Sequence, residues 1–187
     1  MAPLGKGRAP RNLFPKSLRR RPAPATWSPL EYGCHVRDVH RIFAERVRLM
    51  LAEDDPAFAN WDQDVTAIDD HYDLQDPAVV SGELAEAARA MADLLRAVAD
   101  SQWSRTGRRS NGSLFTVDTI GRYYLHDIVH HLHDVGFDAR AVTAGAYDRD
   151  ADARHEGDPR PDRALAATLL TEQDVMAPVF APARSAR

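Results

Sequence analysis

The chain has 187 residues, of which 44% are hydrophobic and 28% charged, and its formal net charge at pH 7 is −4. This length and composition suit one soluble domain, and no apolar run approaches the roughly 18 residues that a membrane span needs. The single cysteine, Cys34, excludes an intrachain disulfide framework and a zinc site built from several cysteines. We therefore expect a cytoplasmic protein in which any metal ion is held by imidazoles and carboxylates.

The first 26 residues differ from the rest of the chain. They carry seven basic side chains, five prolines and no acidic residue, so the remainder of the chain is acidic. Segments of this kind are most often solvated tails, and we expect residues 1–26 to be a disordered leader. Binding of nucleic acid by this leader is the less favoured alternative.

A helix is predicted from Pro29 to about Leu51. Ser28 can act as its N-cap, and a proline fits the first helical position because the N–H there would be unsatisfied anyway. The inward stripe of this helix contains Val39, Ile42, Phe43 and Met50. His35 lies on the same stripe, whereas His40 is expected to point away from it.

The segment from 52 to 76 is expected to be a long connection. It contains Asp, Asn and Pro residues, which favour turns and loops, and its hydrophobic residues do not recur with a regular period. Trp61, Asp62 and Asp64 lie in it and could form the wall of a pocket. A loop that merely folds back on the helices is the equal alternative.

Two further helices follow. One is predicted from Pro77 to about Asp100, and the other from Val117 to about Val135 with Thr116 as its cap. The sequence contains no strand-like alternation. Residues 138–187 are expected to be mostly disordered, with a short helix over 163–173. The pattern therefore predicts an all-α protein with one domain over residues 27–137.

The predicted helix over 117–135 is rich in histidine. Its inward face is expected to contain Leu125, Val129 and Leu132, and its outward face Asp127 and Asp134. His126 and His130 lie one turn apart beside the inward face, so that both imidazoles can reach one metal ion. His133 returns to nearly the same angle, and His131 is turned toward a flank.

His35 would supply a third inward imidazole from another helix. Three imidazoles suit a divalent ion such as zinc or nickel, with manganese as a further candidate, and leave a position for water or a substrate atom. For each histidine the alternative is a core residue with satisfied hydrogen bonds. Glu31 or Asp38 could orient the His35 ring through its second nitrogen, although an acid at the helix N-terminus also explains Glu31.

Three segments together resemble the DinB/YfiT-like superfamily, in particular an actinobacterial DinB-like branch. They are residues 27–39, residues 58–64 and the sequence His-Asp-x-x-His-His at 126–131. The resemblance implies an all-α, DinB-like four-helix bundle with up-down-down-up connectivity. It also implies a metal site made of His35, His126 and His130, the set that the helix pattern indicates.

The resemblance further implies a class of chemistry. Members of the superfamily include thiol-dependent S-transferases and a mycothiol-dependent maleylpyruvate isomerase, in which the metal is thought to activate a low-molecular-weight thiol. We therefore expect a metal-dependent thiol S-transferase or hydrolase-like enzyme acting on a small molecule, with a thiol such as mycothiol as a further cofactor. Trp61, Asp62 and Asp64 would lie on the substrate side.

The chain also departs from the superfamily pattern. The first helix of the bundle should precede Trp27, where this chain has only the proline-rich leader, so the bundle is expected to be incomplete at its N-terminus. The exposed groove would need a cover, either the segment 163–173 or a second subunit in a homodimer. The alternative function is a non-catalytic, truncated bundle that acts in binding or assembly.

Overall fold

The computed structural model describes residues 16–134; most of the predicted leader and the tail with its helix at 163–173 lie outside the described residues. The described range contains four α-helices: α1 (Pro29–Ala52), α2 (Gln63–Asp69), α3 (Pro77–Ala97) and α4 (Val117–Asp134). The three predicted helices correspond to α1, α3 and α4, and their predicted bounds hold to within a few residues. The all-α interpretation is confirmed, although α2 was not predicted.

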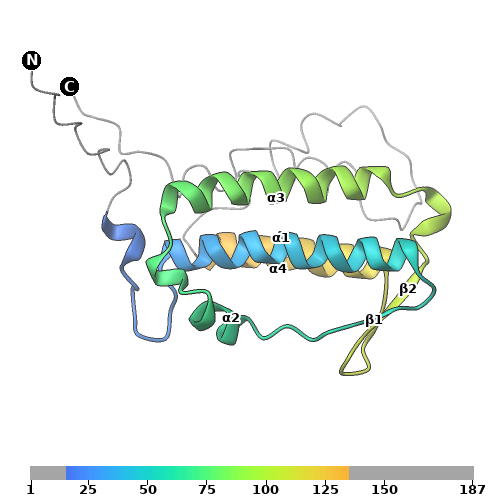
Figure 1. The fold of residues 1–187 in the computed structure, drawn as a ribbon, viewed down its shortest axis with the longest axis horizontal. Coiled ribbons are helices and arrows are strands. Elements are labelled where there is room, and N and C mark those ends of the chain that lie inside the picture. Colours follow the sequence, from blue (N-terminus) through green and yellow to red (C-terminus); the bar gives the residue numbers. More distant parts are fainter. Residues whose placement is uncertain (1–15, 135–187) are drawn as a thin grey trace, which may run out of the picture.

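The three long helices run along one another (Figure 1). α1 and α3 point in the same direction, and α4 runs antiparallel to both. Because α1 and α3 are parallel, the connection over 53–76 must carry the chain back along the length of α1, and Figure 1 shows it doing so with α2 near its end. This order reproduces the last three helices of the expected up-down-down-up connectivity.

Both ends of α1 are capped. The Ser28 hydroxyl accepts a hydrogen bond from the Glu31 N–H, and the Glu31 carboxylate accepts one from the Ser28 N–H, which completes a capping box. At the other end, Arg105 donates to the carbonyl oxygens of Met50 and Glu53, each at 2.6 Å. These carbonyls would otherwise lack partners, so Arg105 fixes where α1 ends.

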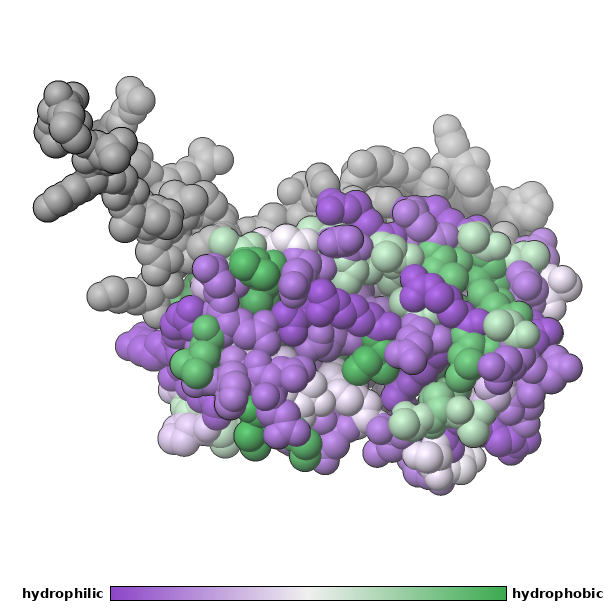
Figure 2. All heavy atoms as spheres, in the orientation of Figure 1, coloured by the Kyte–Doolittle hydropathy of each residue, from purple (hydrophilic) through white to green (hydrophobic). Residues whose placement is uncertain are grey.

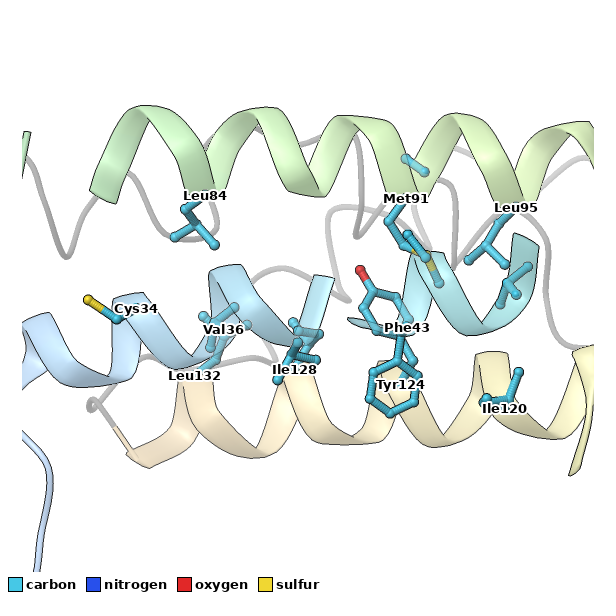
Figure 3. Packing of buried hydrophobic residues seen from close by; sticks show 14 of the residues in the cluster. Cys34, Val36, Phe43, Leu84, Met91, Leu95, Ile120, Tyr124, Ile128 and Leu132 are labelled. Atoms are coloured by element: carbon cyan, nitrogen blue, oxygen red, sulfur yellow. The ribbon is translucent and has the colours of Figure 1, made fainter. Parts of the chain in front are cut away.

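The hydrophobic core lies between α1 and its two neighbours (Figure 3). Its members include Val39, Phe43, Val47 and Met50 of α1, Leu84, Met91 and Leu95 of α3, and Ile120, Tyr124, Ile128 and Leu132 of α4. Figure 3 shows the α3 and α4 side chains directed toward α1 from opposite sides. α1 is therefore the central helix of the described structure.

Three short strands form a small sheet that was not predicted. They are β1 (Ala57–Phe58), β2 (Thr106–Arg109) and β3 (Leu114–Thr116). β2 lies in the middle, parallel to β1 and antiparallel to β3. Strands this short are below the length at which alternation can be recognised in a sequence. The sheet ties the start of the long connection to the segment that leads into α4.

The face that α4 turns inward differs from the predicted one. Ile120, Tyr124, Ile128 and Leu132, at i, i+4 spacing, are buried, whereas Leu125 and Val129 are only partly buried. The prediction ignored Tyr124, whose aromatic ring is a large apolar group that packs in the core. The Tyr124 hydroxyl is hydrogen-bonded to Nδ1 of His40 at 2.6 Å. His40 was expected to point away from the core, and this prediction is wrong.

A buried polar network connects α1 to the long connection and to α3. Arg37 donates two hydrogen bonds to the carboxylate of its neighbour Asp38, each at 2.9 Å, and a third to Glu83 of α3. The Tyr72 hydroxyl donates to the same Asp38 carboxylate at 2.6 Å. Charge-assisted bonds of this kind compensate for the burial of both charges.

The surface of the described residues is mostly hydrophilic on the face seen in Figure 2, with hydrophobic residues in smaller patches between hydrophilic ones. Within residues 16–134, no helix has both the length and the apolar character that crossing a membrane would require.

Gly107 of β2 offers a test of the packing between the sheet and α1. A Cβ at this position would lie 2.7 Å from Cγ of Met50 and 2.9 Å from Cε1 of Phe58. Gly107→Ala should lower the free energy of unfolding by about 1–3 kcal/mol, measured by urea denaturation. Gly82→Ala, on an exposed turn of α3 with open space around it, is the matched control and should raise stability by about 0.5–1 kcal/mol. A Gly107→Ala protein as stable as the parent would contradict this packing.

His40 should make the fold sensitive to acid. Burial lowers the pKa of His40 from 6.5 to about 3, so the imidazole is neutral in the folded protein. In the unfolded chain the ring takes up a proton near its ordinary pKa, so stability is lost as the pH falls from about 6.5 toward 3. The loss attributable to His40 should be about 1.4 kcal/mol per pH unit, and it should be absent in His40→Gln. Urea denaturation of both proteins at about pH 7.5 and 5.5, on either side of the ordinary histidine pKa, measures it; equal losses would refute this origin.

Candidate functional site

His35 occupies an aromatic environment on the first half of α1. Its side chain is 0% exposed. Its ring stacks on Trp61 at 5.2 Å between centroids and with 7° between planes, and a second tryptophan, Trp27, lies at 5.1 Å. Burial, together with the nearby His131, lowers the pKa of His35 to about 3. The ring is therefore neutral and keeps a nitrogen lone pair available at physiological pH.

The polar edge of His35 faces α4. Nε2 of His35 lies 2.8 Å from Nε2 of His131, and Oδ1 of Asp127 lies 3.7 Å from the same His131 nitrogen. The ligand atoms of all three residues lie within 4.8 Å of one another. We refer to His35, Asp127 and His131 as the His35 cluster. Burial raises the pKa of Asp127, and the neighbouring histidines act against that rise.

Asp134 orients His131 within this cluster. Nδ1 of His131 lies 3.3 Å from Oδ2 of Asp134, one turn further along α4. When the Nδ1–H donates to this carboxylate, the lone pair of His131 is left on Nε2, facing His35. A carboxylate that fixes a histidine tautomer in this way is a common support for metal ligands.

The His35 cluster fits a divalent metal ion. Ligand atoms around a zinc ion at about 2.0–2.2 Å are separated by about 3–3.5 Å, close to the spacing in the cluster. Two imidazoles and one carboxylate form a donor set suited to zinc and to other first-row metals, and three protein ligands leave a position open. Hydrogen bonding within residues 16–134 accounts for only one of the two ring nitrogens of His35, because Nε2 faces His131 while Nδ1 is buried without a partner there.

The structure places His126 and His130 away from this cluster. Neither is buried, and their ring centroids are 6.4 Å apart. The side chain of His130 is 62% exposed and pairs with Asp134 at 3.2 Å. The two groups of close metal-ligating atoms among the described residues are the His35 cluster and a second group of His130, His131 and Asp134. Only His35 of the three predicted ligands belongs to the first.

The two acids expected beside His35 have other partners. The Glu31 carboxylate accepts hydrogen bonds from Arg21 and from the Ser28 N–H. Asp38 is held by Arg37 and Tyr72 in the network described above. Neither carboxylate is hydrogen-bonded to Nδ1 of His35, which has no partner. Both acids therefore serve to cap and anchor α1.

The predicted pocket residues separate into different roles. Trp61 covers the His35 ring and donates a hydrogen bond from Nε1 to the Thr66 hydroxyl at 2.7 Å. Asp62 is the N-cap of α2, and Asp64 is exposed in its first turn. His133 belongs to α4, but its side chain lies outside the described residues. Of the three predicted residues in the connection, Trp61 contacts the His35 cluster directly.

Cys34 has no part in the site. Its side chain is fully buried, and burial raises the pKa of the thiol to about 12. The thiol therefore stays protonated at physiological pH and is not an activated nucleophile, and Cys34 belongs to neither group of close metal-ligating atoms among the described residues. The sequence also predicted an inert thiol, although it placed Cys34 only half inside the protein.

Sequence reasoning did not place Asp127 and His131 beside His35. These two residues have the same i, i+4 spacing as His126 and His130, shifted by one position. A shift of one residue rotates the pair by about 100° around the helix. The buried positions of Tyr124 and Ile128 decide which pair faces α1, and these two residues were the available signal.

Comparison with known proteins identifies the family. A family model described as the DinB superfamily matches residues 11–135, more than half of the chain. The chain belongs to the DinB superfamily. No curated protein matches it. The resemblance noted in the sequence is thus confirmed, and this DinB chain carries the His35 cluster within the matched range.

A solved structure supports the fold. The chain is similar to that of YfiT from Bacillus subtilis, with a TM-score of 0.57 and 24% identity over 68% of this chain and 73% of that one. That protein is described as "a probable metal-dependent hydrolase with an unusual four-helix bundle topology". At this level of identity the likeness establishes the four-helix bundle fold of the DinB chain.

Proposed function

We propose that this DinB protein binds one divalent metal ion through His35, Asp127 and His131 and uses it to act on a small molecule. The observation that supports the proposal is the convergence of a buried, neutral imidazole from α1 with an imidazole and a carboxylate from α4. The description of YfiT as "a probable metal-dependent hydrolase" supports the same class of reaction.

The chain's own residues would prepare the site for this chemistry. A bound ion would supply a Lewis acid that lowers the pKa of a coordinated water or thiol. Trp61 and Trp27 shield the His35 ring from water, which strengthens electrostatic interactions at its polar edge. Asp134 would hold His131 in the tautomer that presents Nε2. Hydrolysis and transfer of a low-molecular-weight thiol are both compatible with such a site.

Metal content distinguishes the ligand set of the structure from that of the sequence. The protein should bind about one zinc, nickel or manganese ion per chain, measured by mass spectrometry after reloading and desalting. His131→Ala should lower the retained metal by more than about tenfold, as should His35→Ala, because each removes an inward ligand. His126→Ala is the matched control, because this histidine of the same helix lies outside the cluster and should be dispensable.

The opposite pattern of metal loss in these variants would identify the other ligand set. If His126→Ala removes the metal and His131→Ala retains it, the ligand set is His35, His126 and His130, as the sequence pattern indicated. A parent protein that holds none of the three ions after reloading would refute metal binding and leave the non-catalytic bundle.

Cobalt substitution tests whether a thiol is the partner of the metal. We expect the visible absorption of the cobalt-loaded protein to change when a low-molecular-weight thiol such as mycothiol is added, because sulfur is a softer ligand than water. The alcohol analogue in which oxygen replaces sulfur is the control and should leave the spectrum unchanged. An unchanged spectrum with saturating thiol would favour hydrolysis over thiol transfer.

A further inference from the structure

We propose that Arg46 and Arg109 form a binding site for an oxyanion group, a carboxylate or a phosphate, of a small-molecule ligand. The two arginines lie with four aromatic residues at the junction of α1, the sheet and α4. We refer to this set as the arginine–aromatic cluster; it consists of Arg46, Arg109, Phe43, Phe58, Phe115 and Tyr123. The site is separate from the His35 cluster and does not depend on a metal.

The aromatic rings hold the two guanidinium groups in one enclosure. Cζ of Arg46 lies 5.3 Å from the ring of Phe43 and 5.2 Å from that of Phe58. Cζ of Arg109 lies 5.2 Å from Phe115 and 5.6 Å from Tyr123. Cation–π contacts of this kind orient a guanidinium without using its N–H donors.

Contacts between the rings close the enclosure. The Phe43 and Tyr123 centroids are 5.8 Å apart, and those of Phe58 and Phe115 are 6.4 Å apart. A further contact of 6.1 Å joins Phe115 to Tyr123. The two arginines are therefore held by a continuous aromatic frame that comes from three parts of the fold.

The positive charge in this enclosure is not neutralised. In the part of the chain that the structure describes, neither arginine forms a salt bridge with a carboxylate. Arg46 is only 5% exposed, and burial followed by the charge of Arg109 lowers its pKa. Arg37, which is equally buried on the same helix, is paired with Asp38 and Glu83. The charge of Arg109 acts on the pKa of Arg46, and burying like charges that no carboxylate of the described residues neutralises is costly.

Most N–H donors of the two guanidinium groups also have no hydrogen-bond acceptor among residues 16–134. Arg46 donates one hydrogen bond, from Nη2 to the carbonyl oxygen of Ala59 at 3.1 Å. Nε of Arg109 is buried without a hydrogen-bond partner. A guanidinium carries several donors in a planar fork that matches a carboxylate or a phosphate. An oxyanion would supply both the missing charge and the missing acceptors.

Part of the arginine–aromatic cluster lies at the protein surface. Tyr123 is 44% exposed, and Arg109 and Phe115 are partly exposed. Arg46 lies eleven residues after His35 on α1, which places it on nearly the same face about 16 Å further along the helix. Tyr123 precedes Asp127 by one turn of α4. The two clusters therefore lie along the same side of the α1 and α4 pair.

Titration calorimetry with inorganic phosphate tests the anion site. The full chain, kept in chelator at constant ionic strength, should bind phosphate saturably. Arg109→Gln should weaken binding by about tenfold or more, because it removes a charged donor. The matched control is Arg108→Gln: this neighbour on β2 is exposed and paired with Asp55, so affinity should be unchanged. Acetate, titrated in parallel, shows whether the site prefers a carboxylate or a phosphate.

Two further variants test the anion site even if Arg109→Gln does not fold. Arg109→Lys retains the charge but loses the planar fork, so it should bind phosphate more weakly than the parent even if Arg109→Gln fails to fold. His131→Ala should bind phosphate as the parent does, since the site is independent of the His35 cluster. Parent-like affinity in both Arg109 variants, or loss of binding in His131→Ala, would overturn the proposal. The metal measurements above are unaffected by either outcome.

Discussion

The structure depends on the burial of α1 around its whole circumference. Every residue from Gly33 to His40 is buried, which amounts to more than two full helical turns covered on all sides. Several of these residues are polar or charged, and a buried polar group without a partner is costly. Asp38 therefore binds Tyr72, His40 binds Tyr124, and His35 faces His131. Each of these contacts fixes the position of another segment against α1.

The sequence predicted where the three long helices begin and end, but not which face α4 turns toward α1. Caps such as Ser28, and stripes such as that containing Phe43 and Met50, are local and can be recognised without knowledge of the fold. The strands and α2 are too short for a period to appear. The rotation of α4 was not predicted because Tyr124 was left out of the apolar pattern; its hydroxyl is hydrogen-bonded to His40, a partner on another helix that a local pattern does not reveal.

The candidate site shows the same limit. The hypothesis that a histidine of α1 joins ligands of α4 rests on features that a sequence displays, and His35 was found from its place on an inward stripe. Either His126 and His130 or Asp127 and His131 can face His35, depending on how α4 is rotated about its axis. The two pairs differ by a shift of one residue, which is a rotation of about 100°. The aromatic covering of His35 was expected only as a general pocket wall. The arginine–aromatic cluster was not predicted, since its members come from α1, α4 and the three strands of the sheet.

The separation along the chain between α1 and its partners has a consequence for folding. Three hydrogen bonds of α1 join residues that lie far apart in the sequence. Asp38 and Tyr72 are separated by 34 positions, Arg37 and Glu83 by 46, and His40 and Tyr124 by 84. Such a high contact order requires long loops to close before the contacts can form. α1 alone would expose both its apolar surface and its charges, so it is not stably folded until α3 and α4 pack against it. The domain should accordingly fold as one cooperative unit.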